Sequence, residues 1–353
     1  MKLRNLIDIE ELTLEEWNEI YALASQIIAH PRDFSDALHG SVMASLFFEP
    51  STRTNFSFQT AMLRLGGTVF GFADPKSSST AKGETLKDTI KMVSGYADVI
   101  VMRSPMEGAA RAASLYADVP LVNAGDGGHM HPTQTLADLT TIAALRGEIR
   151  DLNIGLCGDL KYGRTVHSMI KAMAKFPNIR FTLIAPRDLA IPGYMIDFMK
   201  AHQMKFIEVT NLEATMPQLD VLYMTRIQRE RFTDPLEYDR LKGVYILTRD
   251  KLRNAKKDLL VMHPLPRVDE IAQDVDEDPR AVYFDQARYG MYARMALLMK
   301  LVEQGRKRPA PQEIGSRPIC RNKNCITQTE LYLPNLTRDV GGKCCCAFCD
   351  KEI

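Results

Sequence analysis

The sequence predicts an α/β protein with two doubly wound parallel-sheet domains joined by helices, followed by a small C-terminal β module. The first observation is that short apolar runs, typical of buried strands, alternate with helical segments both before and after residue 150. The second is the length of 353 residues, which exceeds what one compact core of ordinary size holds. The third is that six of the seven cysteines lie within residues 320–349.

The first predicted domain, residues 1–135, begins with helical segments and continues with strands and helices in alternation. The segment Thr13–Glu16 has the form of a capping box that opens a helix. Pro50 ends the first strand, and Ser51 or Thr52 can cap the helix that follows. The strands expected in this domain are residues 42–48, 68–72, 98–103 and 119–124.

The second predicted domain comprises residues 136–286, and a helix over residues 131–148 joins it to the first. A final helix over residues 287–305 is expected to pack back on the first domain. The strands expected in the second domain are residues 152–159, 180–185, 221–225 and 259–262. Residues 306–317 are expected to be a linker, and residues 318–353 the C-terminal module.

Composition and charge narrow the class of protein. Apolar residues make up 45% and charged residues 25% of the chain, the balance of a soluble globular protein. The net charge of +1 provides no basic excess for nucleic acid. No apolar run reaches the length of a membrane span, and the N-terminal segment carries acids where a signal peptide has its apolar core. We expect a cytoplasmic protein that binds neither nucleic acid nor membrane.

The turn Phe48–Thr54 lies between a predicted strand and the start of a helix. A helix start offers backbone N–H groups and the positive end of the helix dipole to an anion. Hydroxyl groups at Ser51, Thr52 and Thr54 add donors, and the guanidinium of Arg53 can bind phosphate in a forked geometry. This turn is therefore a candidate phosphate site, although an ordinary capped turn has the same outline.

Other polar groups follow the predicted strands at the sheet edge where open α/β proteins bind ligands. They are Arg103, His131–Gln134, Asp159–Arg164, Thr225–Arg231 and His263–Arg267. The set is rich in anion-binding groups and poor in nucleophiles, and no dinucleotide, P-loop or HExxH fingerprint accompanies it. Such a set suits direct transfer from a phosphorylated donor to an anionic acceptor, through positioning and charge stabilisation.

Five motifs follow one another along the chain: Phe48–Thr54, Lys82–Thr85, His131–Gln134, Asp159–His167 and His263–Arg267. Together they resemble the motif series of the transcarbamoylase family. Residues 1–305 resemble the catalytic chains of the aspartate branch in particular. The resemblance implies that carbamoyl phosphate and L-aspartate react to N-carbamoyl-L-aspartate and phosphate, the committed step of de novo pyrimidine biosynthesis.

The resemblance also implies a role for each matching residue. The carbamoyl phosphate set is Ser51, Thr52, Arg53, Thr54, Ser78, Lys82, Arg103, His131, Gln134, Pro264 and Leu265. The aspartate set is Lys82, Arg164, Arg226, Gln228 and Leu265. The catalytic set is Arg53, Thr54, Lys82, Arg103 and His131, and the reaction needs no metal or organic cofactor.

The loop that carries Ser78 and Lys82 reaches into the neighbouring subunit's site in this family. The resemblance therefore implies a homotrimer with shared active sites, and trimers of this kind can pair into larger assemblies. Glu49, Glu230 and Arg231 resemble family residues that stabilise domain closure. One departure lies beside the site, where Gly128-His129-Met130 replaces small or Asn-Gln residues; we expect it to tune affinity without abolishing activity.

The cysteine-rich tail has the spacing of a four-thiolate zinc site, with Cys320-x4-Cys325 and Cys346-x2-Cys349 as the knuckles. A tail of this size cannot build its own apolar core, so a structural zinc ion is needed for folding. Cys344 and Cys345 remain alternatives to Cys346, which we prefer because the two-residue knuckle is the tighter chelate.

The tail resembles the zinc domain of the aspartate carbamoyltransferase regulatory chain, fused here to a catalytic chain. We expect it to pack against a catalytic domain, its own or a neighbour's. The linker has no room for the regulatory chain's nucleotide-binding domain.

Two other functions remain open from the sequence. One is a transcarbamoylase for a different amino acid, although Arg226 and Gln228 favour an acidic acceptor. The other is a non-catalytic protein that uses the zinc module for contacts with partners.

Overall fold

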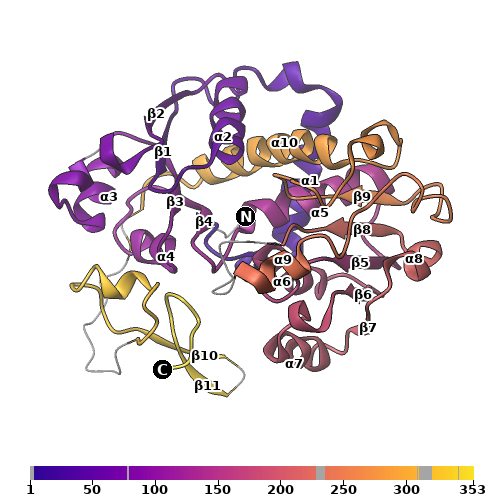
Figure 1. Ribbon diagram of the computed structural model, residues 1–353. Helices are drawn as coiled ribbons and strands as arrows, with labels where there is room; N and C mark the ends of the chain where they lie inside the picture. The colour runs from indigo at the N-terminus through magenta and orange to yellow at the C-terminus, as the bar shows by residue number, and fades with distance from the viewer. Residues whose placement is uncertain (1–3, 78, 228–234, 308, 310–319, 341) are drawn as a thin grey trace. The chain divides into compact units, whose positions relative to one another are not determined.

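A computed structural model describes residues 4–353 of the chain, with the exception of residues 78, 228–234, 308, 310–319 and 341 (Figure 1). The chain divides into two compact units, which we call unit 1 and unit 2. Unit 1 comprises Met1–Leu136 and Gly290–Ile353, and unit 2 comprises Ala137–Tyr289. The two boundaries fall within helices α5, Pro132–Arg146, and α10, Tyr283–Val302.

Unit 1 contains a four-stranded sheet of order β2-β1-β3-β4, in which all neighbouring strands are parallel. The strands are β1 Val42–Phe47, β2 Thr68–Phe72, β3 Val99–Ser104 and β4 Leu121–Asp126. The helices are α1 Leu14–Ala29, α2 Thr52–Arg64, α3 Leu86–Ser94 and α4 Ala109–Ser114. This unit confirms the doubly wound parallel sheet that the alternation of apolar runs predicts.

One apolar core of unit 1 forms where α3 and α4 pack on the sheet. Ala44 and Leu46 of β1 and Ile100 of β3 are buried against side chains such as Ile90 and Ala113. Strand β2 lies at the edge, and its side chains are exposed or half-buried. The capping box at the start of α1 is present, with Thr13 and Glu16 bonding each other's backbone N–H groups.

Unit 2 contains a five-stranded parallel sheet of order β7-β6-β5-β8-β9. The strands are β5 Asn153–Cys157, β6 Arg180–Ile184, β7 Lys205–Val209, β8 Val221–Met224 and β9 Leu260–Met262. The helices are α6 Arg164–Met173, α7 Gly193–Ala201, α8 Leu212–Thr215 and α9 Pro235–Leu241. The sequence did not predict β7, because an edge strand with no buried side chain lacks the apolar run by which the others were found.

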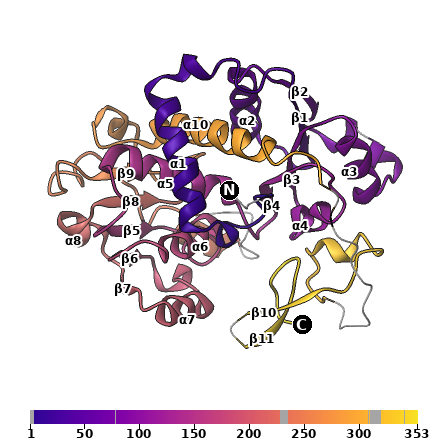
Figure 2. The same cartoon turned by 180° about the vertical axis from the view of Figure 1, so that it is seen from behind.

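The tail forms a small antiparallel sheet of β10, Thr337–Val340, and β11, Lys343–Cys346. It belongs to unit 1, where its residues Ile326 and Phe348 lie in the same apolar core as α3 and α4. Both ribbon views show the tail, drawn in yellow, beside α4 (Figures 1 and 2). Among the described residues, no helix has the length and apolar character needed to span a membrane.

Candidate active site and metal centre

The turn after β1 leads directly into the N-terminus of α2. Ser51 is the N-cap residue, its backbone is extended with φ −158°, and its side chain makes no capping hydrogen bond. Thr54 is buried in the first turn, while the side chains of Thr52 and Arg53 are exposed. The start of α2 therefore combines backbone N–H groups, the positive end of the helix dipole, hydroxyl groups and a guanidinium, which together suit an anion.

Arg103 and His131 meet at the carboxyl end of the sheet. The Nη1 atom of Arg103 lies 3.4 Å from Nε2 of His131, and its Nε atom donates to Glu49 Oε2 over 3.0 Å. Gly125 makes this approach feasible, since a Cβ atom there would lie 3.2 Å from Arg103 Nη1, and its φ of +126° also favours glycine. Neither Glu49 nor Gly125 is conspicuous in the sequence as a support for this arginine.

The strand order places this cluster at a switch point of the sheet. The chain runs from β1 outward to β2 on one side, and from β3 outward to β4 on the other. Phe47, the last residue of β1, pairs with Arg103 of β3, so the turn into α2 and Arg103 leave neighbouring strands. A switch point is where open α/β sheets bind ligands, because the diverging connections leave a crevice.

The remaining predicted donor-side residues of unit 1 are less enclosed. Lys82 is exposed at the end of a short 3-10 helix, Ser79–Lys82, and within the described part of the chain no carboxylate forms an ion pair with it. Gln134 is half-buried in the first turn of α5. Ser78, predicted beside Lys82, lies outside the described residues.

Unit 2 has its own switch point, between β5 and β8. Arg164 begins α6 after β5, and Arg226 follows β8, so the two arginines leave adjacent parallel strands at the same sheet edge. The two loops are tied together, because the N–H of Asp159 donates to Thr225 Oγ1 over 3.0 Å. Two half-buried guanidinium groups at one edge suit a ligand with more than one carboxylate. Gln228, Glu230 and Arg231 lie outside the described residues.

A buried network holds the segment that contains Pro264 and Leu265. The N–H of His263 donates to Gln286 Oε1 over 3.0 Å, and the N–H of Leu265 donates to His263 Nδ1 over 2.7 Å. With Nδ1 as acceptor, Nε2 is the donor toward Glu270 Oε1 at 2.7 Å. Sequence reasoning missed Glu270 and Gln286, and nothing in the local pattern marks either residue.

We expect Glu270→Gln to lower the free energy of unfolding by about 2 kcal/mol at neutral pH, because the buried Nε2–H of His263 and the backbone N–H groups of Val268 and Asp269 lose a carboxylate acceptor. Burial raises the pKa of the Glu270 carboxyl, but the hydrogen bond from His263 outweighs burial and holds the pKa below its usual 4.5. The carboxylate therefore stabilises the fold fully above that pH, and this stabilisation is lost as the pH falls through the native pKa.

Urea denaturation at neutral pH and at about pH 4 checks this expectation. The difference between the wild type and Glu270→Gln should narrow on acidification. Glu208→Gln, on the exposed edge strand β7, is the matched control and should change little. A difference that stays constant with pH would show that the charge of Glu270 is not what stabilises the segment.

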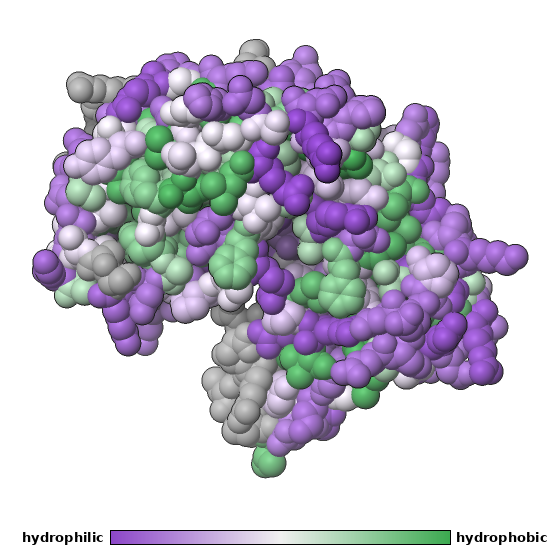
Figure 3. Space-filling view, turned by 90° about the horizontal axis from the view of Figure 1, so that it is seen from above, coloured by the Kyte–Doolittle hydropathy of each residue, from purple (hydrophilic) through white to green (hydrophobic). Residues whose placement is uncertain are grey.

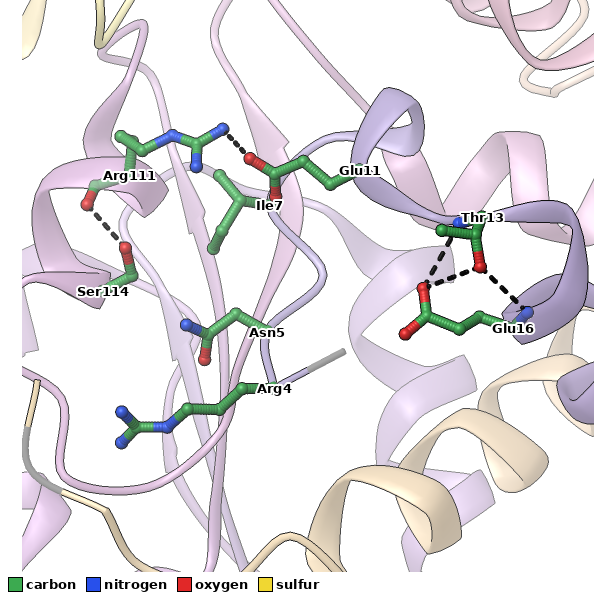
Figure 4. A pocket seen from close by; sticks show the side chains of 8 residues that line it. All are labelled: Arg4, Asn5, Ile7, Glu11, Thr13, Glu16, Arg111 and Ser114. Atoms are coloured by element: carbon green, nitrogen blue, oxygen red, sulfur yellow. Dashed lines mark hydrogen bonds and ion pairs between the residues drawn. The ribbon is translucent and has the colours of Figure 1, made fainter. Parts of the chain in front are cut away.

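One pocket of about 380 Å³ lies elsewhere in unit 1, next to the N-terminal segment (Figure 4). Its lining includes Arg4, Asn5, Glu11, Arg111 and Ser114, and none of the predicted site residues. Figure 4 shows Arg111 facing Glu11, with which it forms an ion pair. Because its lining contains none of the predicted site residues, the pocket does not add to the candidate active site.

Comparison with known proteins agrees with these two sheets. Residues 4–144 match the family model for the carbamoyl-P binding domain of aspartate/ornithine carbamoyltransferase, and residues 150–301 match the model for its Asp/Orn binding domain. The chain is 55% identical over 303 residues to the aspartate carbamoyltransferase catalytic subunit of Clostridium perfringens. The aligned region covers 86% of this chain and 99% of the Clostridium chain.

The chain belongs to the aspartate/ornithine carbamoyltransferase family. Another carbamoyltransferase relative, the aspartate carbamoyltransferase catalytic subunit of Finegoldia magna, is 56% identical over 302 residues, 86% of this chain and 99% of that one. The catalytic subunit of M. jannaschii aspartate transcarbamoylase matches with a TM-score of 0.81 at 48% identity, over 86% of this chain and 99% of that chain.

A further solved structure is aspartate transcarbamoylase from Trypanosoma cruzi in complex with N-(phosphonacetyl)-L-aspartic acid. It matches with a TM-score of 0.79 at 39% identity, over 84% of this chain and 95% of that chain. Both matched carbamoyltransferase domains end by residue 301, so the cysteine-rich tail lies outside them.

The tail added to this carbamoyltransferase chain brings four cysteines together. The Sγ atoms of Cys320, Cys325, Cys346 and Cys349 all lie within 4.8 Å of one another, and all four residues are buried. The Sγ pairs Cys320–Cys349 and Cys325–Cys346 are 3.6 and 3.9 Å apart. A tetrahedral zinc ion with Zn–S bonds of about 2.3 Å would separate its ligands by about 3.8 Å, so the donor set fits such an ion.

Cys346 is in the cluster, whereas Cys344 is exposed and Cys345 lies outside it. None of the seven cysteines forms a disulfide.

The tail packs on its own chain, through unit 1 of the carbamoyltransferase region. Glu107, just before α4, donates its N–H to Asn324 O over 2.8 Å and accepts from Ile326 N–H over 2.9 Å. At the start of α3, the N–H groups of Leu86 and Lys87 donate to Glu330 Oε1 over 3.0 Å and Tyr332 Oη over 2.8 Å. The contact therefore includes backbone bonds to the residue before α4 and bonds from the start of α3 to side chains of the tail.

Proposed function

We propose that the chain transfers the carbamoyl group of carbamoyl phosphate to the amino group of L-aspartate, the committed step of pyrimidine biosynthesis. The observation that carries this proposal is the Arg103–His131 pair beside the N-terminus of α2, at the switch point between β1 and β3. The relatives from Clostridium perfringens and Finegoldia magna are named as catalytic subunits with this activity.

Unit 1 supplies the donor side of the proposed reaction. The turn after β1 holds the phosphate, and Arg103 and His131 hold the carbamoyl oxygen. Gln134 binds the carbamoyl amide. The full set proposed for carbamoyl phosphate on this unit is Ser51, Thr52, Arg53, Thr54, Ser78, Lys82, Arg103, His131 and Gln134.

Unit 2 supplies the acceptor side. Arg164 and Arg226 bind the two carboxylates of aspartate, assisted by Gln228. The segment held by His263 contributes the backbone carbonyls of Pro264 and Leu265, which accept hydrogen bonds from amide or amino N–H groups of the substrates.

The chemistry needs no covalent intermediate with the protein. The lone pair of the aspartate amine attacks the carbamoyl carbon, the new C–N bond forms, and the C–O bond to phosphate breaks. The phosphate leaves with the electron pair of that bond and takes the proton that the amine loses. Arg103 stabilises the negative charge that develops on the carbamoyl oxygen, while the start of α2 stabilises the departing phosphate.

Ornithine is the alternative acceptor, because the matched domain model covers both branches of the family. Two arginines at the β5/β8 edge favour an acidic side chain over the ammonium group of ornithine. If the chain turned over ornithine but not aspartate, ornithine would be the acceptor in place of aspartate.

We also propose a homotrimer with active sites shared between subunits. Lys82 is exposed in a polar segment near the edge strand β2. The same unit exposes Phe56 and Leu63 on α2 and Phe70 on β2, apolar surface of the kind that oligomer interfaces bury. Figure 3 shows apolar side chains gathered among polar ones on one face of the molecule.

An assay of carbamoyl-L-aspartate formation tests the function directly. The wild type should be active, and Arg53→Ala and Lys82→Ala should each lose most activity, by about a hundredfold or more. A wild-type chain that forms no carbamoyl-aspartate would contradict the proposal.

Mixing the two inactive variants tests the shared site. In a mixed trimer, some sites take Arg53 from a Lys82→Ala chain and Lys82 from a neighbouring Arg53→Ala chain. Such a site contains both side chains, so activity should return. Subunit exchange is verified by mass spectrometry of differently tagged chains. Exchange without recovery would show that each site draws both residues from one subunit.

We further propose that the four clustered cysteines hold one structural zinc ion, and that the chain acts in the cytoplasm, where unpaired thiols persist. The zinc ion would stabilise the tail and take no part in carbamoyl transfer.

A further inference from the structure

His129 bridges the carbamoyltransferase region to the tail. Its Nδ1 atom lies 3.0 Å from Asp126 Oδ2, and its Nε2 atom lies 2.9 Å from Asp350 Oδ2. Burial lowers the pKa of this imidazole, but the hydrogen bonds and charges of Asp126 and Asp350 outweigh burial and raise the pKa to about 10. Both ring nitrogens therefore donate, and a cation lies between the two carboxylates.

On one side of the bridge, Asp126 fixes the loop between β4 and α5. Its Oδ1 atom accepts from the N–H of Met130 over 2.9 Å, and its Oδ2 atom accepts from the N–H of Gly108 over 2.8 Å. Its own N–H donates to Met130 O over 3.2 Å, which closes the loop. The residues that flank this closed loop are Gly125 and His131, and both lie against the guanidinium of Arg103.

On the other side, the cysteine knuckle fixes Asp350. The N–H of Asp350 donates to Cys346 O over 2.9 Å, and Asp350 directly follows Cys349. Arg338 of β10 forms a second ion pair with the same carboxylate, at 2.5 Å. The position of Asp350 therefore depends on the folded turn that Cys346 and Cys349 make.

Beside the His129 bridge, the backbone of the tail lies in close contact with the backbone before α4. A Cβ atom on Gly108 would lie 2.5 Å from Phe348 O, and Gly108 has φ +81°, so this position requires glycine. Gly108 also donates to Asp126, so the backbone against which Phe348 of the tail packs is bonded to the same carboxylate as His129.

We propose that His129 is a positioning residue, through which the docked tail sets the geometry of the Arg103–His131 pair and thereby the affinity for carbamoyl phosphate. The connected atoms run from Asp350 through His129 and Asp126 to the loop that ends at His131. The role in substrate affinity rests on the proposed function, whereas the coupling of the tail to the loop does not. His129 lies in the segment 128–130, where the sequence is expected to depart from the family motif, and its partner Asp350 lies in the tail, outside both matched domains.

The His129 bridge is not needed to keep the tail docked, because other contacts hold the tail on unit 1. The bonds of Glu107, Leu86 and Lys87 to the tail do not involve Asp350. Asp350→Asn should therefore leave the tail docked while it removes one carboxylate from His129. A purely structural bridge would change stability and leave the substrate constants alone.

The first test compares steady-state constants of His129→Asn, Asp350→Asn and the double variant. Each single change should raise KM for carbamoyl phosphate by about tenfold, with kcat reduced by less than about threefold. The double variant should be no worse than either single variant, because both remove the same connection. Glu352→Gln is the matched control, since Glu352 is a tail acid whose ion pair with Lys343 is exposed.

The second test reads the loop without any reaction. Methyl-labelled methionine gives a signal for Met130, which is buried inside the loop and is assigned with Met130→Leu. This signal should shift in Asp350→Asn and remain in place in Glu352→Gln. An unmoved Met130 signal in Asp350→Asn would overturn the coupling, whether or not the enzyme is active on aspartate.

A shifted signal with an unchanged KM would overturn the role in substrate affinity. If the wild type lacked carbamoyltransferase activity altogether, the proposed function would fail separately, and the Met130 signal would still decide the coupling of tail and loop.

Discussion

Replacing Arg103 with alanine is expected to lower kcat for carbamoyl-aspartate formation by about a hundredfold to a thousandfold. Its guanidinium lies half-buried at the β1/β3 switch point, 3.4 Å from His131 and held by Glu49. In the Arg103→Ala variant, β3 would no longer provide a permanent cation to stabilise the negative charge that develops on the carbamoyl oxygen. The loss should appear mainly in kcat, because the oxyanion is a feature of the transition state.

Arg111→Ala is the matched control for this experiment. Arg111 belongs to the same unit and forms an ion pair with Glu11 at the wall of the pocket in Figure 4, away from the candidate site residues. Its removal should leave kcat within about twofold, since none of the candidate site residues lines the pocket in which Arg111 lies. Similar kinetics for the Arg103 and Arg111 variants would contradict a direct role of Arg103, provided that circular dichroism shows both to be folded.

The second large effect is expected from Cys325→Ser. One of four thiolates is lost, so the bound metal should fall from about one zinc ion per chain to nearly none. The tail should then unfold, because its own apolar residues cannot form a core without the cluster. Elemental analysis measures the zinc, and limited proteolysis followed by mass spectrometry locates the unfolded segment.

Cys344→Ser is the control for the metal site. Cys344 lies two residues from Cys346 but is exposed, outside the cluster of four Sγ atoms. The variant should retain about one zinc ion per chain and the protease resistance of the wild type. If Cys344→Ser lost its zinc and Cys325→Ser retained it, the proposed set of four zinc ligands would be wrong.

The tail is the part of this chain that lies outside the two matched carbamoyltransferase domains. Matched relatives cover 86% of the chain, and both family domains end by residue 301. The tail shares the apolar core of α3 and α4, so its folding adds to the stability of unit 1. Through His129 it also contacts the loop before His131, which gives the added module a route to the candidate site.

Local features of the chain were predicted correctly. The capping box at Thr13 depends on residues three apart, and the apolar run 42–48 depends on neighbours in one strand. Strand β4 was predicted two residues too early, because Pro120 lacks the N–H that a ladder needs and β4 instead extends to Asp126. The α/β class and the family motifs could also be predicted from the sequence, because strand ends and helix starts depend on residues that are adjacent in the chain.

The sequence by itself therefore determined the class of the fold, the family and the residue types at the strand ends. Only the tertiary structure decided which distant side chains meet. Gln286 holds His263 across 23 positions, and Asp350 reaches His129 across 221 positions. It also separated Cys346 from Cys344, and it placed β7 at a sheet edge. Periodicity and capping act between neighbours in the chain, whereas a hydrogen bond between distant residues depends on how the packed elements bring their atoms within about 3 Å.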